Sequence, residues 1–196
     1  NTMAAFASHT LHINDLWTLN DGARIGGSFL KSTFVDKTFF PFPFDNVKQN
    51  NLVGSGNLGI IFTPSSWKFS LMASTGYRAP NIDDMSKVFE SVAGTPTTPG
   101  TLIIPNPELK PEKTINGDLS ITKFFGDKVR LEGIVFATKL YDAIATMPTN
   151  FNGQSQIIYG GYPANVVSSQ NVSKAYLYGF NGILRADLTE KFAITA

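Results

Sequence analysis

The sequence predicts an all-β fold, namely a sector of a large antiparallel transmembrane up-and-down β-barrel with about eight strands. Three observations predict it: polar and apolar residues alternate along many segments, short turns exchange with long loops, and aromatic residues lie near the short turns. Successive side chains of a strand point to opposite faces, so alternation marks a wall with one apolar face. We expect residues 1–196 to form this one sector, without a plug domain or signal peptide, and to end in mid-strand.

The composition excludes several other classes of protein. The 16 Lys and Arg against 15 Asp and Glu leave a formal net charge of +1, which disfavours nucleic-acid binding. Zero Cys removes disulfides, thiolate catalysis and sulfur-based zinc sites, and two His make other transition-metal sites hard to build. No run approaches about 18 apolar residues, so no transmembrane helix is expected.

Strand-like alternation appears in eight stretches of the chain. In order, they are Ala5 to Leu19, Ala23 to Phe34, Leu52 to Thr63, Trp67 to Tyr77, Thr114 to Phe125, Val129 to Tyr141, Ala175 to Ala186, and a last stretch that begins at Phe192. Proline has no N–H to donate to a ladder, so we expect all 11 Pro to lie between these strands.

The connections between the stretches alternate in length. The short ones contain residues that favour hairpin turns and are Asn20-Asp21-Gly22, Pro64-Ser65-Ser66, Gly126-Asp127-Lys128 and Asp187 to Lys191. The long ones are Phe34 to Asn51, Arg78 to Lys113 and Asp142 to Lys174. They exceed the roughly 12 to 15 residues that compact domains tolerate without structure. Outer-membrane barrels have this asymmetry, which predicts short periplasmic turns and long extracellular loops.

The direction of the apolar face depends on further cues. Alternation is clear from Trp67 to Arg78, whereas Ile134 and Phe136 fall on the polar face of their own stretch. Alternation alone fits a small soluble ligand-binding barrel with an apolar interior equally well. The loop asymmetry favours an outward apolar face. So does the position of Trp17 and Trp67 within three residues of a short turn, because this resembles an interfacial aromatic girdle.

Two motifs flank the second long loop. The sequence Tyr77-Arg78-Ala79-Pro80 ends one predicted strand, and Asn106-Pro107-Glu108-Leu109-Lys110-Pro111-Glu112 precedes the next. With their strand flanks, from Trp67 to Ala186, these boxes resemble the barrel of a TonB-dependent outer-membrane receptor. The resemblance implies an active transporter in the bacterial outer membrane, with a plug domain that these residues do not supply.

The resemblance also implies partners and a function. We expect a scarce nutrient at the extracellular loops, the TonB complex acting through the plug segment, outer-membrane lipid around the barrel, and neither nucleic acid nor a cofactor. We do not expect an enzyme, because the only His residues, His9 and His12, lie in the first strand and no loop holds a histidine base. They are three positions apart, on opposite faces of a strand, which disfavours a shared metal.

The ligand follows least directly from the sequence. In haem receptors of this family a histidine between the two boxes binds the iron, but residues 81–105 contain no His. We therefore rank a ferric siderophore or similar iron chelate above haem, with cobalamin and glycans as further alternatives. The candidate contacts are aromatic, amide and guanidinium groups that stack on or bond an amphipathic chelate: Arg78, Phe151, Asn152, Gln154, Gln156, Tyr159 and Tyr162. The same residues could instead pack one loop against another.

The loop between the boxes also has its own pattern. Apolar residues recur at helical spacing after Asn81, which predicts a short helix running toward Gly94. The loop holds five carboxylates, at Asp83, Asp84, Glu90, Glu108 and Glu112. Such oxygens could bind Ca²⁺, although solvated surface charge explains them equally simply, and we predict no metal site.

Overall fold

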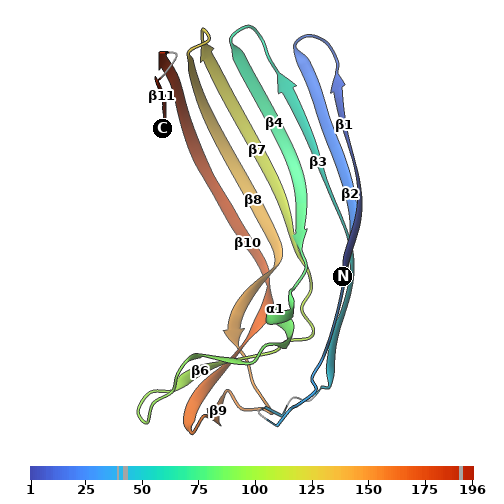
Figure 1. Ribbon diagram of the computed structural model, residues 1–196, viewed down its shortest axis with the longest axis vertical. Coiled ribbons are helices and arrows are strands. Elements are labelled where there is room, and N and C mark those ends of the chain that lie inside the picture. The colour runs from blue at the N-terminus through green and yellow to red at the C-terminus, as the bar shows by residue number, and fades with distance from the viewer. Residues whose placement is uncertain (39, 42–43, 190–191) are drawn as a thin grey trace.

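The strands form one continuous curved sheet. The computed structural model describes residues 1–38, 40–41, 44–189 and 192–196. The 11 strands follow the order β1-β2-β3-β4-β7-β8-β10-β6-β5, and β9 and β11 each pair with β10. Long strands run side by side from tight turns at one end to a crowded loop region at the other (Figure 1). Within the described residues, no helix is long and apolar enough to cross a membrane.

The bounds of the elements agree with eight barrel strands plus short elements in the loops. The barrel strands are β1 (Thr2–His12), β2 (Trp17–Thr33), β3 (Asn46–Phe62), β4 (Trp67–Arg78), β7 (Glu112–Phe125), β8 (Val129–Pro148), β10 (Tyr162–Thr189) and β11 (Phe192–Thr195). The loop elements are α1 (Ile82–Ser86), β5 (Phe89–Val92), β6 (Gly100–Ile104) and β9 (Gln156–Tyr159).

The strand register aligns one apolar row across seven strands. Its members, as successive partners, are Leu11, Leu19, Ile60, Leu71, Leu119, Val135 and Phe180. We call the face that carries this row the outward face. On β7 its residues from Ile115 to Ile121 are exposed, while Asp118 and Ser120 on the inner face are half-buried. A protein that folds in water has the opposite pattern, so this wall suits contact with lipid.

Aromatic side chains gather where the strands meet the short turns. The Trp17 and Phe62 rings stack with centroids 4.3 Å apart, and Phe62 lies 6.1 Å from Phe69. Trp67 stacks on Phe69 at 5.8 Å, and the Lys123 ammonium lies 4.5 Å from the Trp67 ring centroid. This cluster matches the expected interfacial girdle, because amphipathic aromatic rings and lysines favour the boundary between hydrocarbon and water.

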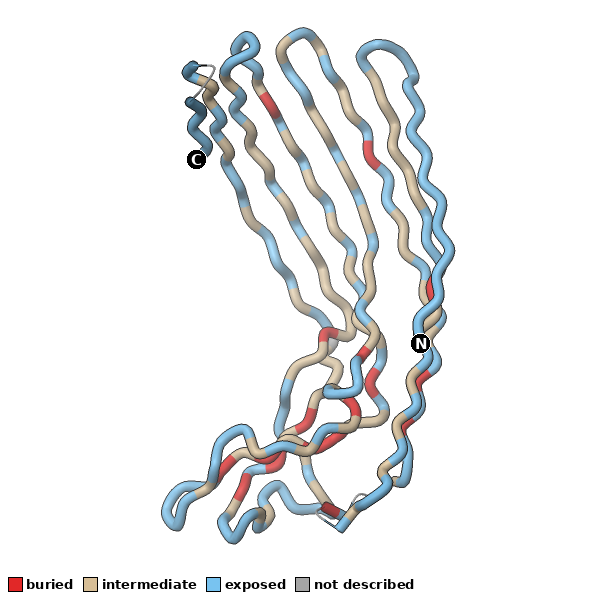
Figure 2. Tube along the Cα trace, viewed as in Figure 1, coloured by how far each residue is buried: buried red, intermediate tan, exposed pale blue. Residues whose placement is uncertain are grey.

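The buried core lies among the loops, away from the wall. Figure 2 shows most of the buried residues at the loop end. One cluster comprises Phe40, Leu102, Ile104, Ala164 and Val166, and a second comprises Val47, Met85 and Leu109. The first depends on β6, which pairs with β10 in parallel, the one such pair among the described strands. The long loops are therefore packed structures.

The predicted turn at Asn20-Asp21-Gly22 is wrong. Those residues lie inside β2, where Asp21 pairs with His9, and the hairpin turns at residues 13–16. Asn14 explains the choice, since its side-chain oxygen accepts from the amides of Leu16 at 2.9 Å and Trp17 at 3.0 Å. This Asx-type turn provides hydrogen-bond acceptors for turn amides, which in a turn at residues 20–22 would bond only to solvent. The turn from Asp187 to Lys191 is described only to Thr189, since residues 190 and 191 lie outside the described part.

The predicted loop from Asp142 to Lys174 is wrong for most of its length. β8 continues to Pro148, and β10 begins at Tyr162, so Pro148 and Pro163 lie within ladders, against the prediction. Pro148 is the last residue of β8, and Pro163 precedes the start of β6 pairing at Ala164. Here the strands extend beyond the apolar wall, and apolar residues fall on both faces, as the neighbours Ala143 and Ile144 show, so the alternation that marks a strand is lost.

The other two long loops are also shorter or more ordered than predicted. The first spans 34–45, because β3 begins at Asn46. In the second, α1 begins directly after its N-cap Asn81, as predicted, but it ends at Ser86 instead of running toward Gly94. Phe89 to Val92 form β5 and pair with β6. Pairing with a neighbouring strand has overridden the helical spacing of these residues.

Candidate functional site

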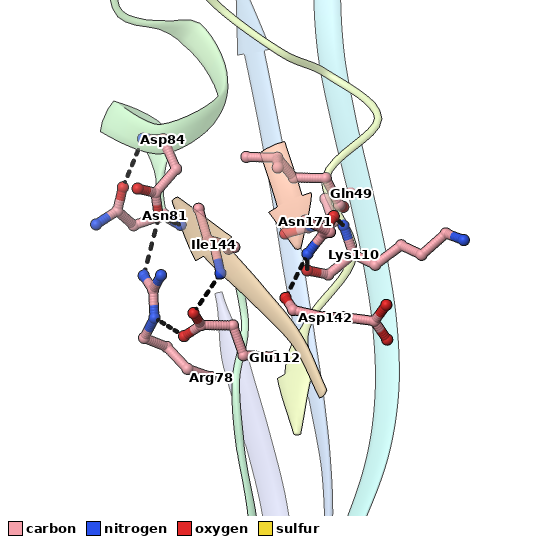
Figure 3. A network of polar contacts seen from close by, with 10 residues as sticks. Gln49, Arg78, Asn81, Asp84, Lys110, Glu112, Asp142, Ile144 and Asn171 are labelled. Atoms are coloured by element: carbon pink, nitrogen blue, oxygen red, sulfur yellow. Dashed lines mark hydrogen bonds and ion pairs between the residues drawn. The ribbon is translucent and has the colours of Figure 1, made fainter. Parts of the chain in front are cut away.

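Arg78 connects the two sequence boxes. It ends β4 opposite Glu112, the first residue of β7, and its Nε donates to the Glu112 carboxylate. Its Nη1 donates to Asp84 at 3.0 Å. The other Glu112 oxygen accepts from the Ile144 amide on β8 at 2.6 Å (Figure 3). Four segments therefore meet at one ion-pair network.

The short helix α1 fixes the position of Asp84. Asn81 caps the helix, and its side chain accepts from the Asp84 amide at 2.8 Å. The Asp84 carboxylate accepts in return from the Asn81 amide at 3.1 Å. This reciprocal capping box stabilises the first turn, and it holds the carboxylate beside Arg78.

The network changes the ionisation of its members. Glu112 lies three residues from Ile115, which is the last apolar residue of the β7 wall at the loop end, and Arg78 is the partner of Glu112 on β4. Both residues therefore lie on the loop side of the membrane-facing surface. Partial burial opposes ionisation of Glu112, but the bonds from Arg78 and the Ile144 amide outweigh it and lower the pKa of the carboxyl group. The Glu112 bond is the largest cause of the raised pKa of Arg78.

The second box anchors the loop to β10 and β3. The Asn106 side chain donates to the Ser169 carbonyl at 2.8 Å and accepts from the Glu108 amide at 3.0 Å. Leu109 is buried, and its carbonyl accepts from the Gln49 side chain at 3.1 Å. Pro107 is half-buried beside them. Most of the box thus has a structural role at this site.

Asn171 is a structural residue that the sequence analysis missed. Its side chain accepts from the Lys110 amide at 2.8 Å and donates to the Lys110 carbonyl at 2.9 Å. It also donates to the Asp142 carbonyl at 2.6 Å. Asp142 has a left-handed backbone with φ of 53°, a conformation that Asn and Asp adopt more readily than most residues. Only the positive-φ propensity of this Asp gave a sequence signal.

The first box also packs the sheet. A Cβ at Gly26 would collide with the Tyr77 hydroxyl, so this glycine leaves room for the ring where β3 and β4 separate. Pro80 is buried and Ala79 is half-buried. The box therefore connects β4 to β2, which lies beyond β3 in the sheet, as well as to the loop.

The remaining candidate contacts lie together at the far loop tip. Phe151 and Tyr159 pack on Phe40, with ring centroids 4.7 and 6.4 Å apart, so part of each ring serves the loop core. The other four are exposed: Asn152, Gln154, Gln156 and Tyr162. Gln156 donates to Asn165 at 3.2 Å. No sequence motif marks this grouping, and no polar contact between described residues joins it to Arg78.

The histidines and acidic residues that the structure describes do not gather into a metal site. Across the described residues, no three His, Cys, Asp or Glu side chains come close enough to hold an ion. His9 lies 3.2 Å from Asp21 on the outward face, and His12 lies 3.1 Å from Thr18 on the inner face. Asp84 and Glu112 instead share Arg78.

A family comparison identifies the architecture. The family described as "TonB dependent receptor-like, beta-barrel" matches residues 1–195. The chain belongs to this family. Its members are transporters and receptors of the bacterial outer membrane, and this chain is accordingly part of an outer-membrane protein.

Individual relatives support the assignment. The iron-regulated outer membrane virulence protein of Vibrio cholerae serotype O1 is 28% identical over 132 residues, covering 66% of this chain and 19% of the relative. The siderophore receptor PirA from Pseudomonas aeruginosa superposes with a TM-score of 0.71 at 17% identity, covering 99% of this chain and 32% of that one. The Serratia marcescens hemophore receptor HasR, solved with its hemophore and heme, gives a TM-score of 0.67 at 18% identity, covering 95% and 32%. This TonB-dependent receptor chain thus spans about a fifth of the Vibrio relative and a third of the two solved chains.

Proposed function

We propose that this chain is the barrel portion of an active transporter for a ferric siderophore or similar iron chelate. The observation that carries the proposal is the loop tip formed by β9 and its neighbours, which presents an exposed tyrosine and three exposed amide side chains on a packed hydrophobic base. Such groups stack on and bond a flat amphipathic chelate. The base fixes the tip in place, so little ordering free energy is lost on binding.

The relatives are consistent with an iron-containing ligand. The Vibrio relative is named for its regulation by iron, and PirA is described as a siderophore receptor. HasR keeps haem as the second candidate. The absence of His from residues 81–105 favours the chelate, since imidazole is among the commonest protein ligands of haem iron.

The inner wall suits transport through a plugged barrel. Inner-face positions carry charges of both signs, namely Arg24, Lys68, Asp118, Arg130 and Glu132. We propose that these groups hydrogen-bond a plug domain, and that the TonB complex remodels this plug to release the bound ligand. An outward apolar wall in contact with lipid completes the arrangement.

Binding titrations of the full-length receptor test the ligand. Purified receptor would be titrated with ferric siderophores and with haemin while tryptophan fluorescence is measured. We expect quenching by a chelate, and a roughly two- to tenfold weaker affinity in the Tyr162→Ala variant, since loss of one stacking ring costs about 0.5–1.5 kcal/mol. Tyr178→Ala, an exposed tyrosine on the outward wall, is the matched control. Submicromolar haemin binding with a low-spin Soret spectrum and no chelate binding would overturn the proposal.

A further inference from the structure

The outward face carries a group of lysines and tyrosines at its loop end. Register places Lys113 beside Tyr141 and Tyr141 beside Lys174 in one row. The next row places Ile115 beside Lys139 and Lys139 beside Tyr176. The Lys139 ammonium lies 4.8 Å from the Tyr141 ring centroid and 5.7 Å from that of Tyr176. We call Lys113, Lys139, Lys174, Tyr141 and Tyr176 the Lys–Tyr patch.

The outward strand positions around the patch carry no carboxylate that would balance its charge, and Asp142, which follows Tyr141, forms no ion pair among the described residues. No Asp or Glu occupies the outward positions of the four strands around the patch. The ranges are 67–77 on β4, 113–125 on β7, 129–141 on β8 and 174–186 on β10. Within the described residues, no ion pair involves Lys113, Lys139 or Lys174. The net charge of +1 for the chain therefore conceals a local cationic surface.

A groove adjoins the patch where β3 and β4 separate. Their ladder ends at Asn57 and Ser74, and the Thr75 hydroxyl accepts from the Gly56 amide at 2.9 Å in place of a further strand pair. The hollow beyond has a volume of about 540 Å³, and its lining includes Leu52, Thr75, Ile115, Tyr141, Lys113 and Asp142. Apolar walls with a lysine at the rim suit a hydrocarbon chain that carries an anionic head.

A second pair of lysines extends the cationic surface. Lys31 on β2 and Lys48 on β3 are direct partners, and both are exposed. Like charges directly opposite each other in a ladder destabilise it unless an anion lies between them. Both residues share the outward face and the loop end of the wall with the Lys–Tyr patch.

We infer that the Lys–Tyr patch and its groove bind a phosphate-bearing lipid of the outer leaflet. The lysine ammonium groups would bond the phosphate oxygens, the tyrosines would lie at the boundary between headgroup and hydrocarbon, and an acyl chain would occupy the groove between Leu52 and Ile115. The complementary charge and the outer-membrane location of the family favour a lipid over any other occupant. This site is separate from the transport pathway, because it lies on the outward face.

Lipid exchange with the full-length receptor tests the inference. Receptor in phosphatidylcholine nanodiscs would be equilibrated with vesicles of phosphatidylcholine containing lipid A, and bound lipid A quantified by mass spectrometry. Each lysine near an anionic headgroup contributes roughly fivefold, so the variant Lys113→Gln/Lys139→Gln/Lys174→Gln should bind lipid A about a hundredfold more weakly. The control Lys68→Gln/Lys87→Gln/Lys128→Gln removes the same charge from the inner face, a loop and a turn, and should bind normally.

Further arms of the experiment separate the alternatives. Arginine at the three patch positions should restore binding, whereas dephosphorylated lipid A should bind weakly to every variant. If the triple glutamine variant does not fold, Lys174→Gln alone should still show the roughly fivefold loss. Equal lipid A binding by patch and control variants would overturn the inference. Saturation of the patch by inorganic phosphate alone, or patch-dependent receptor oligomers without lipid, would overturn the lipid assignment as well.

Discussion

Arg78 and Glu112 are direct partners at the last pair of the β4–β7 ladder, and their side chains also form the ion pair that joins the two sequence boxes. The Glu112 carboxylate is only 14% exposed and accepts from β8 as well. Strand register and ion pair thus place the same two residues together. The loop between them therefore starts and ends at one ion pair, which we call the base of the loop.

The first prediction concerns this base. Glu112→Gln keeps the side-chain shape but removes the charge, and we expect the loop 82–111 to lose about 1–2 kcal/mol of local stability, because half-exposed Arg78 is partly screened by solvent. Amide hydrogen exchange of the full-length receptor measures the loss. Glu108→Gln, an exposed carboxylate of the same box, is the control, and equal exchange in both variants would show that the ion pair is dispensable.

The same pair predicts a dependence on pH. Because folding lowers the pKa of Glu112 from its ordinary value of 4.5, its stabilisation is complete above that value and is lost as the pH falls through the lower folded pKa. Loop protection should therefore be constant at neutral pH and decline in acid. Glu112→Gln should lack this acid-dependent component, so an identical acid profile in the variant would contradict the assignment.

The second site to test is Asn171, whose side chain bonds two backbone segments. Asn171→Leu leaves the Lys110 amide and two carbonyls without their partner, and we expect a cost of about 2–3 kcal/mol to the loop end of β8 and β10. Asn181→Leu, an exposed position on the same strand, is the control. Urea unfolding of both variants in detergent, followed by protease sensitivity of the loops, gives the comparison.

Met85 tests whether the loops have a true core. It is fully buried between Val47 and Leu109, so Met85→Ala should cost about 2–5 kcal/mol of local stability by leaving a cavity. Met147→Ala, at a side chain that is 42% exposed, should change little. Hydrogen exchange of α1 and of residues 100–112 would show the difference, and equal protection in the two variants would mean that the cluster is loosely packed.

The sequence predicted the membrane wall well because its signals are local. Alternation of period two identifies the outward face of β4 and β7 residue by residue, and turn residues locate the hairpins at Ser65 and Asp127. The turn at Asn14 was missed because Asn20-Asp21-Gly22 has the stronger turn composition. The side-chain bonds of Asn14 and the pairing across the hairpin, which aligns Leu11 with Leu19, distinguish the two sites.

The loop end was harder to predict, since its structure depends on contacts between distant residues. The parallel pairing of β6 with β10 joins Gly100 to Ala164, and no local pattern encodes such a contact. The two boxes were recognised by resemblance. That the first forms an ion pair and the second anchors the loop became clear only from the positions of Asp84 and Asn171 in the structure. The proposed ligand contacts remain a prediction.

A substitution on the outward wall should destabilise the receptor even though the side chain is exposed. Leu119 is 43% exposed, yet Leu119→Arg should destabilise the receptor in a bilayer by about 2–4 kcal/mol, because a charge would face hydrocarbon. Ser120→Arg, on the inner face, should be tolerated, since Ser120 already lies beside Glu132. Urea titration of receptor folded into phospholipid vesicles would measure both, and equal stability would argue that this face is not in contact with lipid.

The orientation of the barrel is the last prediction, and it uses single cysteines in a full-length receptor that lacks other thiols. Cysteines at the turn positions Asp15, Ser65 and Asp127 should react with an impermeant maleimide only after the outer membrane is permeabilised, because short turns face the periplasm. Asp45→Cys, Thr97→Cys and Gln154→Cys should react on intact cells. Asp21→Cys separates the two hairpin registers: it should stay unreactive in both conditions, since Asp21 lies on the outward face of β2, whereas a turn at residues 20–22 would expose it to the periplasm. Labelling of Asp15→Cys, Ser65→Cys and Asp127→Cys on intact cells, with protected loops, would reverse the orientation.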